Sequence, residues 1–254
     1  MSNDMQFNRV FITGDTHGDF DWLADWCEEK QSTVCDAIII LGDAGILYYG
    51  AKSEREKALK SYLSKLPITL ICIRGNHEDR PQNRENMKYK DYGYDPIVPN
   101  RVYYEEEYSN ILYLNDGGDY YINGKHYLVV GGAYSVDKEY RLKMKWHWFK
   151  DEELTQEEFC DIADKVDHHK YDSVLTHSCP YEWMPTDLFL AGIDQSKISN
   201  HTEHWLTTIE GIIDYDHWFF GHYHADRKNV CGNGKVHMLS TLCIDIEDFY
   251  KGEI

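Results

Sequence analysis

Seven polar side chains that could bind divalent metal ions each follow a short apolar run directly. They are Asp15, His17, Asp43, Asn76, His177, His222 and His224. Carboxylate, imidazole and amide groups are hard to borderline ligands, and the missing thiolates disfavour a structural zinc or an iron–sulfur site. Seven ligands are too many for one tetrahedral ion, but they suit two ions that share one carboxylate.

Taken one at a time, these residues have simpler explanations. An Asp after a strand usually forms a turn or caps a helix, and Asn76 could be a turn residue with positive φ. His222 and His224 could be alternate positions on one face of a strand. As independent accidents, five such coincidences in one chain are improbable, so we interpret the set as a metal site.

The elements that must position these residues are five short runs without polar alternation, which are typical of strands buried on both faces. The runs are 10–13, 37–41, 68–73, 173–176 and 217–220. Helical patterns lie between them: after Asp19, at 53–66, from 155 toward Val166, and from 200 toward Ile213. Those at Ser53 and Thr155 open with capping-box spacing. This alternation predicts an α/β fold whose mainly parallel strands present ligands at their carboxyl edge.

Other segments have different patterns. Residues 98–136 predict antiparallel hairpins around Gly117-Gly118 and Asn123-Gly124, and 236–239 with 242–246 predict another pair of strands. Residues 81–108 are rich in Tyr and charge, so we expect a mobile loop beside a site. Tyr89 to Tyr121 could form an aromatic wall but are more typical of sheet surface and core rim. Without a linker or repeat, residues 1–254 should form a single domain with two sheets.

The polar turns reproduce a known series of motifs in order. The motifs are Gly14-Asp15-Thr16-His17-Gly18, Gly42-Asp43-Ala44-Gly45, Gly75-Asn76-His77-Glu78, Thr176-His177-Ser178 and Gly221-His222-Tyr223-His224. From about residue 10 to 225, the chain thereby resembles the calcineurin-like metallophosphoesterase superfamily. Residues 131–138 and 146–153 are similar to its bacterial and phage members of unassigned substrate. The resemblance implies a four-layer α/β/β/α sandwich with two mixed sheets and a metal site at the strand carboxyl ends.

The resemblance also implies roles for individual residues. The first ion would be held by Asp15, His17 and His224, the second by Asn76, His177 and His222, with Asp43 bridging the two. His77 would act over the metals as a general acid or a phosphate-binding cation. Two divalent ions make a bridging hydroxide available for attack on phosphorus at neutral pH. We expect manganese, with iron, zinc or nickel as alternatives.

The chain departs from the protein Ser/Thr phosphatase branch after Asp43. That branch continues as Gly-Asp-x-Val-Asp-Arg-Gly, so its Asp and Arg, which orient the histidine and bind phosphate, are missing here. Arg141 has two interpretations: it reaches a substrate phosphate, or, as we favour, it is a surface Arg paired with Asp or Glu. The same two interpretations apply to Arg74 and Arg80. We place outside the site the remaining histidines: His126, His147, His168, His169, His201, His204, His217 and His237.

Composition limits the substrate. With 44 acidic and 26 basic residues, the net charge is −18, which disfavours extended nucleic acid and membrane surfaces. Scattered cysteines, no apolar span and no signal peptide favour a cytoplasmic location. We therefore predict a hydrolase of small phosphodiesters or phosphomonoesters. The alternatives are a nuclease acting on nucleic-acid ends, or a catalytically silent metal-binding scaffold for protein partners.

Overall fold

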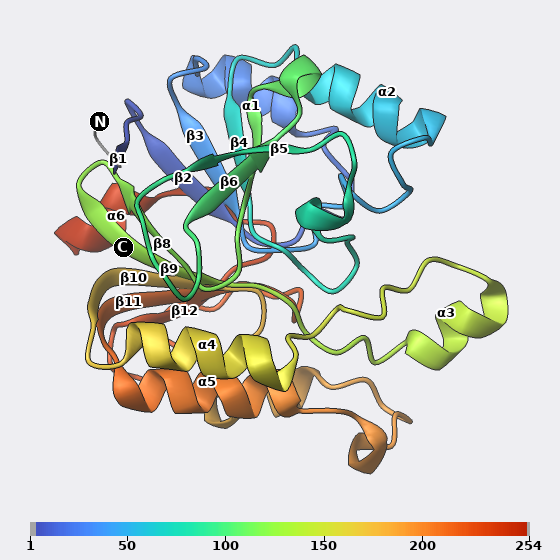
Figure 1. The fold of residues 1–254 in the computed structure, drawn as a ribbon, viewed down its shortest axis with the longest axis vertical. Coiled ribbons are helices and arrows are strands. Elements are labelled where there is room, and N and C mark those ends of the chain that lie inside the picture. The colour runs from blue at the N-terminus through green and yellow to red at the C-terminus, as the bar shows by residue number, and fades with distance from the viewer. Residues whose placement is uncertain (1–3, 253–254) are drawn as a thin grey trace.

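Two β-sheets lie face to face between two layers of helices in the computed structural model, which describes residues 4–252 (Figure 1). Within that range, the first sheet contains β1 (Asp4–Met5), β8 (Gly118–Ile122), β9 (Lys125–Val130), β10 (Lys170–Thr176), β11 (Asp214–Phe220) and β12 (Val236–Met238), in this order. The second sheet contains β13 (Ile244–Asp245), β2 (Val10–Thr13), β3 (Ala37–Ile40), β4 (Thr69–Cys72), β7 (Ile111–Leu114), β6 (Arg101–Tyr104) and β5 (Lys88–Asp91).

Both sheets are mixed. Strands β9 to β12 run parallel to one another, as do β2, β3, β4 and β7, whereas β8, β13, β6 and β5 add antiparallel pairings. Every residue of β2, β3 and β4 is buried. A strand covered on both faces needs apolar residues at every position, which explains the unbroken apolar runs in the sequence.

Helices cover the outer face of each sheet (Figure 1). The second sheet is covered by α1 (Leu23–Lys30) and α2 (Glu54–Leu63), and the first by α4 (Gln156–Val166) and α5 (His201–Ile212). Helix α3 (Lys138–Met144) projects from the sandwich, and α6 (Ile246–Lys251) follows β13. The predicted α/β/β/α sandwich is therefore confirmed. Among residues 4–252, no helix has the length and apolar character needed to cross a bilayer.

Three apolar clusters hold the four layers together. The central cluster joins Ile39 of the second sheet to Leu175 and Phe219 of the first. On the outer face of the second sheet, Ile38 and Ile40 pack with α1 and α2. The third cluster lies between the first sheet and α4 and α5. Alternate residues of one strand thus pack into two different cores. Burial of these apolar side chains is the main source of stability.

The two predicted capping boxes have different outcomes. At α4, the Thr155 hydroxyl accepts a hydrogen bond from Glu158 N, and Thr155 N donates one to Glu158 Oε2. At α2, the helix begins after Ser53 as predicted, but the Ser53 side chain makes no capping hydrogen bond. The reciprocal bond is also missing, because the buried Glu56 side chain pairs with Lys60 at 2.8 Å and Ser53 N donates to Gly50 O instead.

The predicted hairpin around Gly117-Gly118 is wrong. Strands β7 and β8 on either side belong to different sheets, and Gly117, at φ +71°, instead donates a backbone hydrogen bond to Val129 O. The predicted hairpin around Asn123-Gly124 is present and joins β8 to β9. The predicted pair of strands near the C-terminus exists as β12 and β13, but the two lie in different sheets and α6 follows them.

Residues 81–108 are not the irregular loop that their composition predicted. They contain the short 3₁₀ turns η1 (Pro81–Asn83) and η2 (Glu106–Tyr108) together with β5 and β6. All four residues of β5 are exposed, so this edge strand lacks the apolar alternation that identifies a strand in sequence. Its Tyr89 packs beside Tyr103 and under the Arg101 guanidinium, in the predicted role of sheet surface.

Candidate metal centre

Polar side chains from five strand ends meet at one edge of the sandwich. Potential ligand atoms lie within 4.8 Å of one another in three sets, namely Asp15/His17/His224, Asp15/Asp43/His177 and His17/Asp43/His77. Asn76 Oδ1 lies 2.8 Å from His177 Nε2, and the His222 ring centroid lies 4.9 Å from that of His177. The structure thus brings all seven sequence-predicted ligands, and His77, into one cluster.

The backbone at this cluster is unusual. His17 (φ +48°), Asp43 (φ +47°), His222 (φ +68°) and His224 (φ +51°) all adopt the left-handed conformation. Residues other than glycine rarely adopt it, because Cβ crowds the backbone there. Its concentration at four predicted ligands indicates a geometry maintained for function rather than for stability.

Asp43 lies at the centre of the cluster. Its Oδ1 accepts a hydrogen bond of 2.7 Å from His77 N, and its Oδ2 lies 3.6 Å from His177 Nε2. Burial alone would raise the pKa of Asp43, but the surrounding His177, His77 and His17 outweigh burial and lower that pKa. The carboxylate therefore stays charged, with Oδ2 free to meet a cation.

Asn76 and His177 form the clearest indication that a cation binds in this cluster. His177 Nδ1 lies 2.8 Å from Leu41 O, a carbonyl that only accepts, so Nδ1 carries the proton. In the neutral ring, Nε2 then presents a lone pair to Asn76 Oδ1 at 2.8 Å. Asn76 Nδ2 donates to Ser135 Oγ, so its oxygen is the atom facing His177. Two lone pairs this close fit a positive ion bound by both.

The orientation of Asn76 depends on two residues that the sequence did not single out. Ser135 is buried, donates from Oγ to Glu152 Oε2 at 2.6 Å, and so uses its lone pair to accept from Asn76. Ser135 N also donates to Glu152 Oε1. Both residues lie in the stretches similar to bacterial and phage relatives, the only sequence signal for their role.

Asp15 also has an unsatisfied ligand atom. Its Oδ1 accepts a hydrogen bond from His222 N at 2.8 Å. Its Oδ2 is buried and accepts no hydrogen bond from residues 4–252, although His224 Nε2 lies 3.4 Å away. The Asp15 carboxylate raises the pKa of His224. A buried carboxylate oxygen without a donor is costly, and a bound cation would satisfy it.

Two glycines of the motifs allow the backbone to approach the ligands. A Cβ at Gly75 would overlap the Asp43 carboxylate, and a Cβ at Gly221 would overlap that of Asp15. Neither position has room for a side chain.

A further motif residue, Glu78, is buried and accepts a hydrogen bond from Gly45 N at 2.6 Å. Burial raises the pKa of Glu78 to about 8. Glu78 thereby fixes the turn that carries Asp43.

His77 lies at the mouth of the cluster, with 20% of its side chain exposed. Arg141 Nη2 lies 2.7 Å from its Nδ1, and Arg141 also pairs with Asp137 at 2.7 Å. The predicted pairing of Arg141 with an acid is therefore present, but Arg141 is buried rather than on the surface. Burial lowers the pKa of His77, with Asp43 opposing and Arg141 reinforcing that effect.

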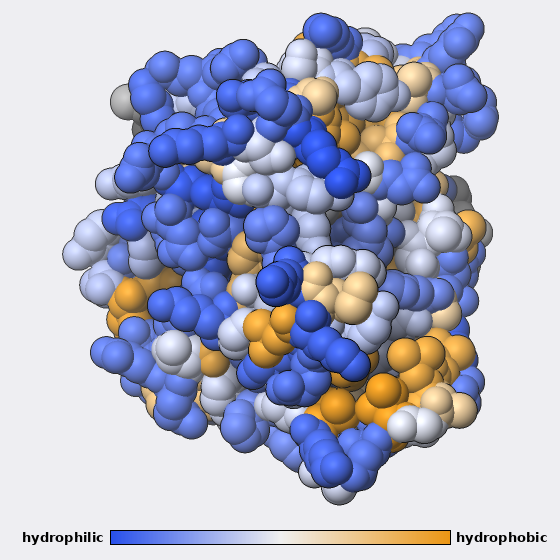
Figure 2. All heavy atoms as spheres, turned by 90° about the vertical axis from the view of Figure 1, so that its right-hand side faces the viewer, coloured by the Kyte–Doolittle hydropathy of each residue, from blue (hydrophilic) through white to orange (hydrophobic). Residues whose placement is uncertain are grey.

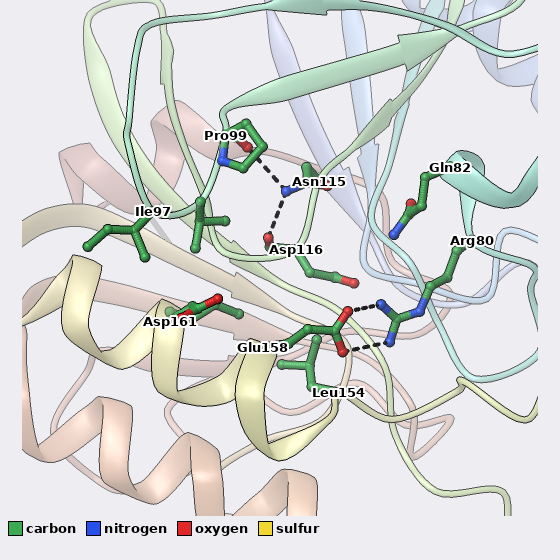
Figure 3. A pocket seen from close by; sticks show the side chains of 11 residues that line it. Arg80, Gln82, Ile97, Pro99, Asn115, Asp116, Leu154, Glu158 and Asp161 are labelled. Carbon is green, nitrogen blue, oxygen red and sulfur yellow. Dashed lines mark hydrogen bonds and ion pairs between the residues drawn. The ribbon is translucent and has the colours of Figure 1, made fainter.

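The other two arginines that flank the Asn76 turn are occupied. Arg74 is buried and bonds to Asp116 at 2.7 Å and to Glu152 O. Arg80 pairs with Glu158 beside a separate cavity of about 170 Å³ (Figure 3). Neither guanidinium is available to a substrate in the cluster. Within residues 4–252, the remaining eight histidines belong to none of the three ligand sets.

The chain matches a known protein family. A family model described as calcineurin-like phosphoesterase matches residues 8–226, a span that includes all seven ligand candidates and His77. No curated protein matches the chain.

Proposed function

The chain belongs to the calcineurin-like phosphoesterase family, and from this membership we propose that it hydrolyses small phosphodiesters or phosphomonoesters with two bound divalent ions. The family itself implies hydrolysis of phosphate esters with divalent metals. The observation that carries the proposal for this chain is the pair of facing lone pairs on His177 Nε2 and Asn76 Oδ1. They are accompanied by the unsatisfied Asp15 Oδ2.

We assign the ligands to two ions. Asp15, His17 and His224, whose ligand atoms lie together, would hold the first. Asn76, His177 and His222 would hold the second, and Asp43 would bridge the two. The donors are oxygen and imidazole nitrogen without thiolate, which favours manganese, with iron, zinc or nickel as alternatives.

The bound ions would lower the pKa of a coordinated water and neutralise charge on the phosphoryl oxygens. His77 would act on the leaving group. Arg141 donates to His77 Nδ1, since a guanidinium has no acceptor, and the His77 proton is therefore on Nε2. From Nε2, the imidazole can donate a hydrogen bond to the leaving-group oxygen and stabilise the negative charge that develops there.

The surrounding charge favours a small substrate over a polymer. The net charge of the chain is −18, and a long polyanion would be repelled by this charge along its whole contact with the protein surface. A small ester meets mainly the metal centre, where two ions would add about four positive charges.

We further propose that residues 1–254 act as a single domain in the cytoplasm. This location suits the seven cysteines, which are all free in the structure.

One set of assays tests the proposal. The protein is stripped of metal, reloaded with manganese, and given bis-p-nitrophenyl phosphate, p-nitrophenyl phosphate and labelled DNA. We expect metal-dependent release of nitrophenol from at least one of the two small esters. Much faster cleavage of DNA would favour a nuclease instead. No turnover of any substrate with manganese, iron, zinc or nickel would favour a metal-binding scaffold.

A further inference from the structure

The segment between β10 and α5 exposes apolar side chains beside the metal centre. Residues 178–200 follow His177 and contain only the short turns η3 (Tyr181–Trp183), η4 (Thr186–Leu188) and η5 (Gln195–Lys197). Leu188, Leu190 and Ile193 are 37%, 66% and 36% exposed. Figure 2 shows hydrophobic surface gathered low on the face that carries α3, at the height where Figure 1 places this segment. Such a gathering marks a contact surface for a ligand or partner.

A cavity of about 510 Å³ connects these side chains to the candidate catalytic residues. Asp43, Asn76 and His77 line one part of it together with His222 and His224. The 178–200 segment lines another part with Met184, Leu188, Phe189, Leu190, Ile193 and Ile198. Cavities of this size hold one small organic molecule or group. A phosphate at the metals would therefore place its ester group against this apolar wall.

The charges in the cavity limit what that group can be. None of the described residues that line the cavity is Lys or Arg, whereas Asp137 and Glu203 both line it. A second phosphate or a carboxylate would find no Lys or Arg side chain among these lining residues to pair with. Charged groups also lose solvation against an apolar wall. The lining thus favours an uncharged apolar group over a second anionic group.

We propose that residues 184–198 form a subsite for an uncharged alkyl or aryl group of the substrate, an inference that rests on the function proposed above. The substrate is then a phosphate ester with one phosphate at the metal centre and one apolar substituent in the cavity. Burying a few carbon atoms in such a pocket favours a substrate that carries the apolar group over one that lacks it by about 10- to 200-fold.

Binding of two non-hydrolysable phosphonates tests the subsite. Methylphosphonate and 1-naphthylmethylphosphonate share a phosphonate head and differ in the apolar group, and calorimetry on the manganese-loaded protein measures each affinity. We expect the naphthylmethyl compound to bind at least about tenfold more tightly. In the double variant Leu188→Asn/Ile193→Asn, that ratio should fall to about threefold or less, with methylphosphonate binding unchanged.

The control is Val34→Asn, which alters an apolar side chain that is 59% exposed and does not line the cavity. It should keep the wild-type affinity ratio, and thermal unfolding should show that both variants fold. Equal affinity of the wild type for the two phosphonates, or an unchanged ratio in the double variant, would overturn the subsite. Hydrolysis of p-nitrophenyl esters is measured in parallel. If the esters are hydrolysed but the two phosphonates bind equally well, only the subsite is refuted. If the phosphonates differ in affinity but neither ester is hydrolysed, the proposed function is refuted and the subsite stands.

Discussion

Arg141 Nη2 donates a 2.7 Å hydrogen bond to His77 Nδ1. Because the guanidinium cannot accept, this contact selects the tautomer of His77 that carries its proton on Nε2. Arg141 is in turn held by Asp137 at 2.7 Å and by His147 O at 3.2 Å. In this chain, Arg141 is thus the side chain that fixes the tautomer and orientation of His77.

Replacing Arg141 should therefore reduce catalysis more than substrate binding. For Arg141→Ala, we expect kcat to fall at least about tenfold, because loss of one hydrogen-bond donor positioned on developing charge costs about 10²–10³-fold, with KM changed less than about twofold. Arg141→Lys should recover part of kcat. In the metal-free protein, ¹⁵N NMR of labelled histidine should show the Nε2–H tautomer of His77 in the wild type and a mixture in Arg141→Ala. An unchanged tautomer together with unchanged kcat would contradict this positioning role.

The parts of the site that the sequence predicts are those next to apolar runs. Asp15, Asp43 and Asn76 each lie a few residues after a strand, so their convergence follows from the parallel sheet edge. Ser135 could not be predicted in this way, because it contacts Asn76 across 59 residues and no local pattern marks the pair. The sequence predicts that Arg141 pairs with an Asp or Glu, and Asp137 at i,i+4 is that partner. The burial of Arg141 was not predicted, because it depends on distant contacts such as Tyr48.

The same distinction explains the fold. The buried strands β2, β3 and β4 have an apolar residue at nearly every position and were predicted from it. Strand β5 is exposed throughout, and α3 is a seven-residue helix of mostly exposed residues, so neither has a periodic apolar pattern. The sequence predicts the turn at Gly117-Gly118, but long-range packing decides which sheet the next strand joins.

Asp43→Asn should remove the bridge between the two ions. An amide has one oxygen ligand and no charge, so we expect metal content measured by mass spectrometry to fall from two ions per chain to one or none. Activity toward either nitrophenyl ester should fall to background. Asp164→Asn, which changes an exposed acid on α4 that belongs to none of the ligand sets, serves as the control and should retain both properties. Full activity in Asp43→Asn would exclude the two-ion assignment.

Gly75→Ala should damage the metal centre, because its Cβ would overlap the Asp43 carboxylate. Relieving the overlap requires Asp43 to move, at a cost of about 1–3 kcal/mol in the free energy of unfolding. Manganese affinity should fall at the same time. The matched control is Gly211→Ala on α5, where no atom lies within 4 Å of the new Cβ, and helix propensity should raise stability by about 0.5–1 kcal/mol. Urea unfolding and manganese titration measure both effects, and wild-type manganese affinity in Gly75→Ala would contradict the prediction.

Glu203 should make the stability of the metal-free protein depend on pH. Its side chain is buried, Ser178 Oγ donates to its Oε1 at 2.6 Å, and burial raises its pKa to about 7. Nearby Glu153 also raises this pKa, while Ser178 and His177 lower it. In the unfolded chain, the carboxyl group ionises with the ordinary glutamate pKa of 4.5. Between these two values the folded protein binds more protons than the unfolded chain, so the free energy of unfolding falls as pH rises and then levels off above about pH 7.

Glu203→Gln cannot ionise and should lose this dependence. Relative to the variant, the wild type should therefore become less stable between pH 5 and pH 8, by up to about 3 kcal/mol. Urea unfolding of chelator-treated protein at both pH values measures the difference. Glu157→Gln, which alters an exposed acid in the first turn of α4, controls for the loss of one negative charge and should follow the wild-type pH curve. Parallel curves for the wild type and Glu203→Gln would show that Glu203 is ionised in the folded protein throughout this range. Other contacts would then offset the free-energy cost of burying the charged Glu203 carboxylate.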